Sequence, residues 1–382
     1  MKVGLHIVGL PHNQANKEHV SCAYGQKHKK FSEMMLSVGY KTYSYYGEHS
    51  DGKATEHIVI SSDEDQSRWF GDYDFKNKFY PITWGVNDEH WVQSNTKAIE
   101  EIDKRIQPND IICLIAGACQ KQIADAFPDH TIVEYGIGYT GVFANFKVFE
   151  SYAHMHWVYG NQRNDNGGFY DCVIPNYFDP QDFTIGLEKD DYYLFIGRLI
   201  QRKGVEIAVE ATRRLGKKLI MAGQGVVENT GNKVVAEDGM VYQGDHIEHI
   251  GSVGVEQRAE LMSKAKAVFV PTTYLEPFGG VSIEAMMSGT PVIASDFGAF
   301  PENVIHGQSG YRFRTIGEAT YYASQAELLS PEYIASYARK NFSTDVIKYK
   351  YDEYFKQLYD LRNGGGFYSN WHGGIDRYGK SY

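Results

Sequence analysis

A chain of 382 residues, 42% hydrophobic and 23% charged, is long enough for two globular domains, and this composition excludes a disordered or fibrous protein. Its formal net charge of −10 argues against indiscriminate binding to nucleic acid or to an anionic membrane surface. Four cysteines fit neither a disulfide framework nor a zinc pattern, and no apolar run is long enough to span a bilayer. We therefore expect a soluble, cytoplasmic protein.

The first half of the chain predicts a doubly wound α/β domain over residues 1–180. A buried strand, KVGLHIVGL, leads to Gly9 and a long loop, and the helix GQKHKKFSEMMLSVG follows. A strand, a glycine loop and a helix in this order are typical of the start of such a domain. The basic run Lys27, His28, Lys29 and Lys30 is expected on the solvated face of this helix.

Further strands of this half surround a poorly defined insertion. HIVIS is a strand candidate, and most of the remainder of residues 51–95 is polar and aromatic. DIICLIAGA is a strongly apolar strand, TIVEYGIGYTG is a strand that runs into a glycine loop, and DCVIPNYFD closes the domain. The aromatic segment FESYAHMHWVYG fits neither a helix nor a strand clearly.

The second half alternates strands and helices regularly, which predicts a second doubly wound domain over residues 190–340. YYLFIGR, KKLIMAGQG and AVFVP are strands, and VEIAVEATRRLG and VEQRAELMSKA are helices. This alternation is typical of a parallel sheet with helices on both faces. Residues 341–382 are expected to form a last helix that can cross back to the first domain, followed by a glycine- and tyrosine-rich tail.

One stretch of the second half, PTTYLEPFGGVSIEAMMSGTPVIA, places two carboxylates around a glycine-rich helix start. Glu276 lies in the loop, Glu284 lies in the helix, and Gly279 and Gly280 lie between them. Glycines at a helix start let an anionic or hydroxyl-rich ligand approach the backbone N–H groups, where the helix dipole favours negative charge. Ionised carboxylates accept hydrogen bonds from sugar hydroxyls, so this stretch suits a polyhydroxylated ligand.

Two cations follow the predicted strand YYLFIGR. Arg198 and Lys203 leave the strand end a few residues apart, at the carboxyl edge where open α/β sheets bind ligands. The planar fork of arginine and the point charge of lysine together suit a diphosphate. Two solvated loop cations are the alternative interpretation.

These two motifs together resemble a known signature. E-P-F-G followed by E-A, with seven residues between the glutamates, and G-R-L-x-x-x-K-G before it resemble the donor site of the retaining glycosyltransferases of family 4, the glycosyl transferases group 1. The resemblance is strong over residues 192–313 and faint before residue 173. It implies a GT-B fold, in which two Rossmann-like domains face each other across a cleft that holds a UDP- or GDP-linked sugar. It also implies transfer with retention of configuration and without a metal or other cofactor.

The resemblance assigns roles residue by residue. Arg198 and Lys203 would hold the donor diphosphate, Glu276 would accept hydrogen bonds from the donor sugar, and these three are the expected catalytic residues. Glu284 would bind the ribose. The other donor-binding residues that we expect are Gly9, Ile250, Gly251, Phe278, Gly279 and Gly280, the segment around Ile250 and Gly251 being the one that resembles a nucleobase site.

The acceptor side is less well defined. Many relatives place a histidine of the first domain against the donor sugar, and the corresponding loop, EYGIGYTG, has none. Glu134, Tyr139 and His154 are the acceptor-side candidates, each with a structural role as its alternative. Asp72 and Asp74 have the D-x-D form by which metal-dependent GT-A glycosyltransferases hold manganese, although such a short pattern is common by chance.

The identity of the acceptor stays open between two classes. Residues 1–50 have six lysines against three glutamates, interleaved with tyrosines and histidines, which suits a phosphate-bearing ligand with stacking bases. The segments LIAGACQKQIADAFPD and VEYGIGYTG resemble enzymes of tailed phages, some of which glycosylate hydroxymethylated pyrimidines in DNA after base flipping. A saccharide or lipid-linked glycan is the other class. A non-catalytic sugar-nucleotide-binding protein would be expected to lack one of Arg198, Lys203, Glu276 and Glu284, and all four are present.

Overall fold

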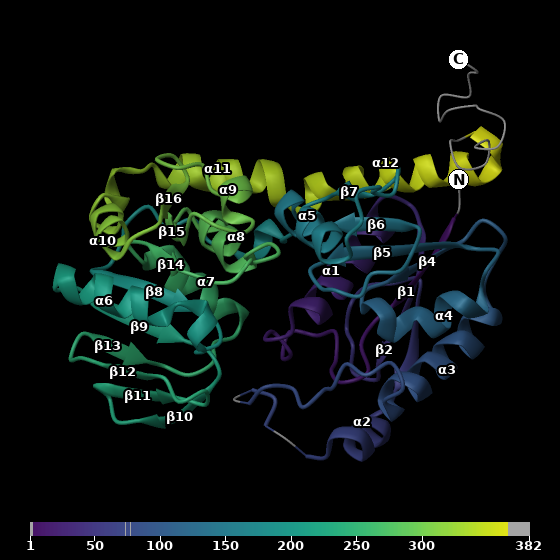
Figure 1. Ribbon diagram of the computed structural model, residues 1–382, viewed down its shortest axis with the longest axis horizontal. Helices are drawn as coiled ribbons and strands as arrows, with labels where there is room; N and C mark the ends of the chain where they lie inside the picture. The colour runs from purple at the N-terminus through teal and green to yellow at the C-terminus, as the bar shows by residue number, and fades with distance from the viewer. Residues whose placement is uncertain (1–2, 73, 77, 366–382) are drawn as a thin grey trace.

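The computed structural model describes residues 3–72, 74–76 and 78–365, and it contains two large sheets, each flanked by helices (Figure 1). Seven strands form the first sheet and six form the second. Every pairing between the described strands of these two sheets is parallel. The predicted α/β class with two parallel sheets is confirmed.

The first sheet has the strand order β3-β2-β1-β4-β5-β6-β7. The chain therefore moves from β1 to one side and returns to the other side at β4, and the loops at the carboxyl ends of β1 and β4 diverge. In open α/β sheets such a switch point is where ligands bind. The strands are β1 (Gly4–Val8), β2 (Lys41–Gly47), β3 (Glu56–Ser61), β4 (Ile111–Leu114), β5 (Thr131–Ile137), β6 (Phe146–Phe149) and β7 (Cys172–Val173).

The second sheet repeats this arrangement with the order β13-β9-β8-β14-β15-β16, so that β8 and β14 flank its switch point. All three strands predicted from the regular alternation lie in it. Its strands are β8 (Tyr192–Ile196), β9 (Lys218–Ala222), β13 (Ile247–His249), β14 (Val268–Val270), β15 (Val292–Ser295) and β16 (Gly310–Phe313). A small antiparallel sheet, which the sequence pattern did not indicate, lies between β9 and β13 in the chain and consists of β10 (Val226–Asn229), β11 (Lys233–Ala236) and β12 (Val241–Gln243).

Helices fill the connections in both halves. The aromatic segment FESYAHMHWVYG, which fitted neither a helix nor a strand clearly, forms a helix. Ser151 caps its first turn by accepting a hydrogen bond from the His154 N–H. The first-half helices are α1 (Ala23–Ser37), α2 (Asp63–Phe70), α3 (Glu89–Asp103), α4 (Lys121–Ala126) and α5 (Tyr152–Asn161). The later ones are α6 (Val205–Leu215), α7 (Val255–Lys264), α8 (Gly280–Met287), α9 (Phe300–Asn303), α10 (Ile316–Ser324), α11 (Pro331–Phe342) and α12 (Thr344–Asp360).

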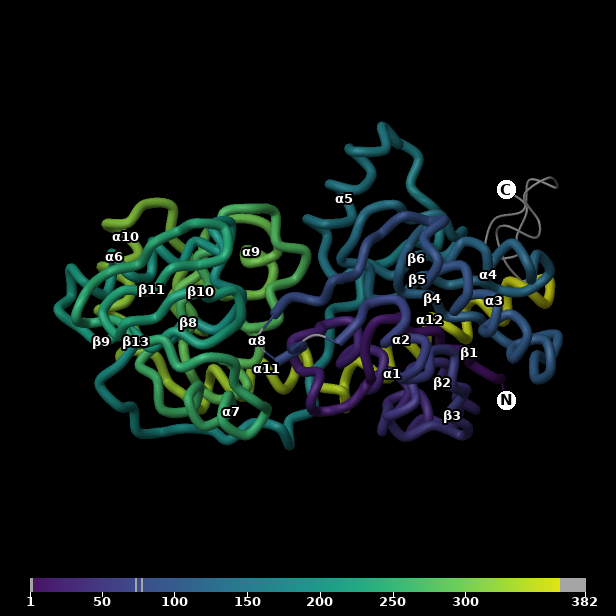
Figure 2. The backbone as a smooth tube through the Cα atoms, turned by 90° about the horizontal axis from the view of Figure 1, so that it is seen from below, coloured from purple at the N-terminus to yellow at the C-terminus, as the bar shows by residue number. Residues whose placement is uncertain are grey.

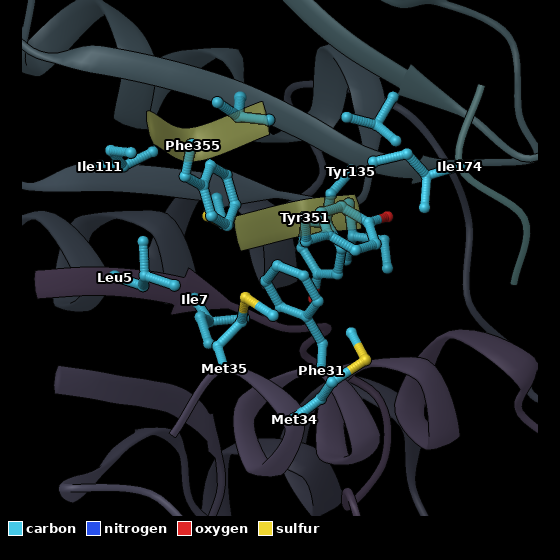
Figure 3. Close-up of a cluster of buried hydrophobic side chains, with 14 of the residues drawn as sticks. Leu5, Ile7, Phe31, Met34, Met35, Ile111, Tyr135, Ile174, Tyr351 and Phe355 are labelled. Carbon is cyan, nitrogen blue, oxygen red and sulfur yellow. The ribbon is translucent and has the colours of Figure 1, made fainter. Parts of the chain in front are cut away.

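The last helix packs on the first half of the molecule. Figure 1 shows α12 leaving the second sheet and running along the edge of the first. Its Tyr351 and Phe355 meet Phe31 of α1 with ring centroids 4.9 and 6.2 Å apart, and Phe31 also stacks on Tyr135 of β5 at 4.2 Å (Figure 3). Each of these rings is buried. Burial of one such side chain is worth about 1.5–3 kcal/mol, so α12 contributes substantially to the first core. The tail predicted beyond α12 falls outside the described residues from 366 onwards.

The basic run in α1 is not a solvated face, and that prediction is wrong. Lys27 and His28 are buried, and Lys27 forms an ion pair with Glu150 of 2.7 Å between Nζ and Oε1. His28 hydrogen-bonds to the Ser44 hydroxyl at 2.8 Å. The helix is packed on two sides, against the sheet and against α12, so more of its circumference is covered than a single amphipathic stripe predicts.

Among the described residues, no helix is both long enough and apolar enough to cross a membrane.

Candidate donor site

Lys203 and Glu276 meet at the carboxyl edge of the second sheet. Lys203 ends a short turn after β8, and Glu276 lies in the loop after β14, so neighbouring strands deliver the two side chains to one place. The Lys203 Nζ lies 2.6 Å from the Glu276 Oε2 and 3.1 Å from the Tyr274 hydroxyl. Burial alone would lower the pKa of Lys203, but Glu276 and Tyr274 outweigh it and raise the pKa. The ammonium group therefore stays charged at neutral pH.

The helix α8 begins beside this pair with two glycines that cannot be replaced freely. Gly279 has a positive φ of 78°, and a Cβ there would lie 2.4 Å from the Phe300 ring. A Cβ at Gly280 would lie 3.3 Å from Phe178. The first turn carries no acidic side chain, so the positive end of the helix dipole is not neutralised within the helix. An anionic group of a ligand would be favoured here.

Glu284 of α8 is paired across to α7. Its two carboxylate oxygens each lie 3.0 Å from the Nη1 of Arg258. Lys30 of α1 approaches from the first half: its Nζ lies 4.9 Å from the centre of the Phe178 ring. Burial lowers the pKa of Lys30, and Glu284 acts in the opposite direction. Glu284 thus faces positive charge from both halves of the molecule.

Arg198 follows β8 and is exposed. Among the described residues no side chain or backbone group forms a hydrogen bond or an ion pair with its guanidinium, whose carbon lies 5.4 Å from the centre of the Phe79 ring. Lys203 and Arg198 were predicted to act together, and both follow β8 in the chain. Lys203 contacts Glu276 and Tyr274, whereas Arg198 lies beside Phe79.

The predicted nucleobase segment lies at the end of β13. The Ile250 N–H donates to the Met221 carbonyl and the Gly223 N–H donates to the Gly251 carbonyl, so the segment extends the pairing with β9. Gly251 has a positive φ of 78° and open space around its missing Cβ. Phe278, in contrast, is buried in the core of the second half, 6.4 Å from Phe178 between ring centres, so only its backbone can reach a ligand.

The first half contributes Lys27, Glu150 and Tyr24 to the region opposite Glu276. Lys27 also donates to the Gly136 carbonyl at 2.9 Å, and Tyr24 donates to the Gly138 carbonyl at 3.2 Å. Burial raises the pKa of Glu150, and the negative charge of Glu276 adds to this effect. Glu150 comes directly after β6, so the rule that carboxyl strand ends converge could have found it.

Two further contacts join the halves beside this group. The Ser151 hydroxyl donates to the Pro277 carbonyl at 2.7 Å. The Glu302 carboxylate accepts the backbone N–H groups of Tyr152 and Ala153 at 2.9 and 2.7 Å and so caps α5 from the opposite half. A carboxylate at a helix N-terminus is favoured by the helix dipole. The loop that contains Glu276 is therefore held directly against the first half.

The acceptor-side candidates have structural contacts. Glu134 is fully buried and accepts hydrogen bonds from the N–H groups of Phe143 and Ala144, both at 2.8 Å, and from the Tyr139 hydroxyl at 3.2 Å. His154 is buried, and its Nε2 hydrogen-bonds to the Tyr139 carbonyl at 3.1 Å. These contacts fix the loop after β5 and fit the structural role that was the alternative for each residue, and the acceptor-side role of Glu134, Tyr139 and His154 stays a prediction.

Gly9 also has a packing role. A Cβ at this position would lie 1.7 Å from the Tyr46 ring, and its carbonyl accepts a hydrogen bond from the Gln120 side chain at 2.8 Å. Gly9 is buried, so this packing is a sufficient reason for the glycine, and its donor-binding role stays a prediction.

Asp72 and Asp74 are exposed, and Tyr73 between them lies outside the described residues. Within the described part of the chain, the group of three that could hold a metal ion is Glu48, His49 and Asp63, and neither aspartate belongs to it. Asp74 instead accepts a hydrogen bond from the Lys76 N–H at 3.2 Å. The arrangement gives the D-x-D interpretation no support.

Comparison with known proteins identifies the part of the chain that builds this site. Residues 179–331 match the family model described as Glycosyl transferases group 1. An uncharacterized glycosyltransferase of Methanocaldococcus jannaschii is 29% identical over 184 residues, which are 47% of this chain and 46% of the relative. Glycogen synthase of Mycobacterium tuberculosis is 34% identical over 128 residues, 31% of this chain and 28% of the relative. The chain thus spans less than half of these curated relatives.

Solved structures extend the similarity to the whole fold. Sucrose-phosphate synthase from Thermosynechococcus elongatus superposes with a TM-score of 0.67 at 16% identity, covering 94% of this chain and 100% of that one. Anabaena HepE in complex with UDP-glucose gives 0.63 at 15% identity and covers 93% and 100%. The predicted GT-B fold is confirmed. The comparisons therefore identify a glycosyltransferase-type domain at residues 179–331 within a chain of GT-B fold.

Proposed function

We propose that this chain is a retaining, metal-independent glycosyltransferase of family 4 that moves a sugar from a UDP- or GDP-linked donor to a saccharide or lipid-linked glycan. The observation that carries the proposal is the charged Lys203–Glu276 pair beside the glycine-started helix α8, at the carboxyl edge of a parallel sheet. These residues lie within the segment that matches the family model. The structure of HepE with UDP-glucose supports a donor of the same kind.

The chemistry that these residues can perform is stabilisation of a leaving group. When the bond between the sugar and the diphosphate breaks, negative charge develops on the departing phosphate oxygen. Lys203 is charged, has three donors and uses two of them on Glu276 and Tyr274, so one remains for phosphate. Arg198 adds a fork of donors and α8 adds its dipole. Positive groups that are already in place need little reorganisation during the reaction.

The two glutamates do not form a glycosidase-like pair. Each forms an ion pair with a cation of its own, Glu276 with Lys203 and Glu284 with Arg258. A glycosidase needs one protonated carboxyl group as its acid. Retention would instead follow if the acceptor oxygen attacks from the side of the leaving phosphate, which takes the acceptor proton. The new sugar–oxygen bond then forms on the face from which the old one departs.

We propose the glycan class for the acceptor because one argument for DNA, the stacking of bases on the tyrosines of residues 1–50, is weakened. The basic and aromatic residues 1–50 suggested a phosphate-bearing ligand with stacking bases, but Tyr40, Tyr45 and Tyr46 are buried, and so is Lys27 among the lysines. Buried groups cannot contact a nucleic acid backbone.

All four cysteines are free thiols, in keeping with a reducing cytoplasmic environment.

The test is an acceptor screen with two readouts. The protein is incubated with pooled UDP- and GDP-sugars in EDTA, with oligosaccharides or lipid-linked glycans in one set and hydroxymethylcytosine DNA in another. Mass spectrometry follows the acceptor, and a coupled assay follows free nucleoside diphosphate. A glycan heavier by one sugar supports the proposal. A heavier base would move the acceptor to phage-type modified DNA, and activity only after added manganese would overturn metal independence. Donor binding without transfer to any acceptor would favour the sugar-nucleotide-binding alternative.

A further inference from the structure

The connection between α2 and α3, part of the insertion that the sequence left undefined, reaches the second half of the molecule. In Figure 2 this blue segment extends away from α2 toward the other half. The Gln224 side chain, in the loop after β9, donates one hydrogen bond to the Phe75 carbonyl at 2.8 Å and another to the Lys76 carbonyl at 3.1 Å. Gln224 is buried, so both of its amide donors are used on this connection.

The connection is also fixed to the first half. The Phe75 ring stacks on His19, with 4.1 Å between ring centres and 8° between the planes. The Tyr80 ring lies edge-on to His12 at 4.9 Å. Aromatic contacts of this kind each contribute on the order of a single hydrogen bond. Phe79 is thus carried on a segment that is anchored at both ends.

Phe79 lies against Arg198 and Gly225. The guanidinium carbon of Arg198 is 5.4 Å from the ring centre, within the range of a cation–π contact. A Cβ at Gly225 would lie 2.8 Å from the Phe79 Cζ, and Gly225 has a φ of 96°, so this position needs a glycine both for its backbone and for the ring. A larger residue at position 225 would displace Phe79.

We propose that Phe79 is a positioning residue of the donor site: it holds the Arg198 guanidinium by one face so that the N–H edge is presented to the diphosphate. This inference rests on the proposed function. An arginine on an exposed turn otherwise samples many rotamers, and ordering it on binding costs affinity. A ring that covers one face leaves all five N–H donors free, because they lie in the guanidinium plane. The first half thereby takes part in donor binding without contacting the donor.

The test measures binding of UDP and of GDP by calorimetry in the full chain. Phe79→Leu keeps apolar bulk and removes the ring, and we expect binding of the preferred diphosphate to weaken about three- to tenfold, the effect of one cation–π contact with partial loss of order. Phe79→Tyr keeps the ring and should restore binding. Tyr321→Leu, which removes an exposed ring on α10, is the matched control and should leave binding unchanged.

A double-mutant cycle separates positioning from general stability. In an Arg198→Ala background, Phe79→Leu should have no further effect on binding, because the group that Phe79 positions is gone. An equal loss in both backgrounds, or undiminished binding in Phe79→Leu, would overturn the inference. Lys203→Ala separates the proposed donor site from the proposed role of Phe79. If the wild type binds a diphosphate and Lys203→Ala does not, the donor site is supported whatever the result for Phe79→Leu. Absence of diphosphate binding in wild type would overturn both.

Discussion

The two halves of the molecule build their sides of the site in different ways. In the second half, Lys203, Glu276 and the start of α8 all follow strand ends within short segments of chain. In the first half, the groups that face them come from α1, from the end of β6 and from the α2–α3 connection. The contrast shows that the edge proposed to bind the diphosphate is encoded locally, whereas a wall assembled from distant segments leaves no motif.

The largest expected effect is the loss of transferase activity when a residue of the second half, whose side of the site is encoded locally, is replaced. Lys203→Ala should reduce transfer at least about 100-fold, because it removes a charged donor that we propose to stabilise the departing phosphate. Release of nucleoside diphosphate with the identified donor measures it, and circular dichroism checks the fold. Lys217→Ala removes an exposed cation that pairs with Asp191 and should have no effect. Undiminished turnover in Lys203→Ala would refute the site.

The next effect concerns stability in the first half. Lys27→Met leaves Glu150 buried without its cation, and we expect unfolding in urea to need about 3–5 kcal/mol less free energy. Lys29 lies in the same helix, and Lys29→Met breaks its much more exposed pair with Asp51, which should cost less than about 1 kcal/mol. Equal losses would mean that α1 presents a solvated basic face after all. The double variant Lys27→Met with Glu150→Gln should recover part of the loss.

The pH dependence of stability tests the same helix. Burial, with a smaller effect from His57, lowers the pKa of His28 from its usual 6.5 to about 3. The unfolded chain therefore takes up a proton below pH 6.5 that the folded chain does not accept until about pH 3. The contribution of His28 to the free energy of unfolding is fully present above pH 6.5 and falls as the pH drops.

At pH 5 this difference from His28 alone is about 2 kcal/mol. The variant His28→Gln should lose that much less stability than wild type between pH 7 and pH 5, as measured by urea unfolding at each pH. His156→Gln, at an exposed position of α5, serves as the control. Parallel pH profiles for wild type and His28→Gln would show that His28 is accessible to protons in the folded state.

The smallest effect sharpens the role of the second carboxylate. Arg258→Ala should weaken donor binding about tenfold, seen as a higher KM with little change in kcat, because Glu284 loses the partner that orients it but still reaches the donor. Arg213→Ala removes an exposed pair with Glu210 on α6 and should change neither constant. A large fall in kcat at unchanged KM would instead place Arg258 in the chemical step.

Much of the second half could be predicted from sequence because its signals are local. Alternating strands and helices predicted the parallel sheet, and the spacing of Glu276 and Glu284 around Gly279 predicted the helix start that the structure contains. What the pattern did not reveal was pairing at long range. Arg258, which holds Glu284, lies in an ordinary amphipathic helix, and Tyr274 carries no signal of its own contact with Lys203.

The sequence by itself determined the two parallel sheets and the residues at the carboxyl edge of the second one, because strand period, glycine positions and strand-end cations are properties of short segments. Only the tertiary structure decided where the polar residues of the first half go. Lys27 and His28 are buried because Glu150 after β6 and Ser44 of β2 meet α1 in the folded chain. Phe79 meets Arg198 across 119 positions of chain because the two halves come together. Contacts of that kind depend on how whole elements pack, which no local pattern specifies.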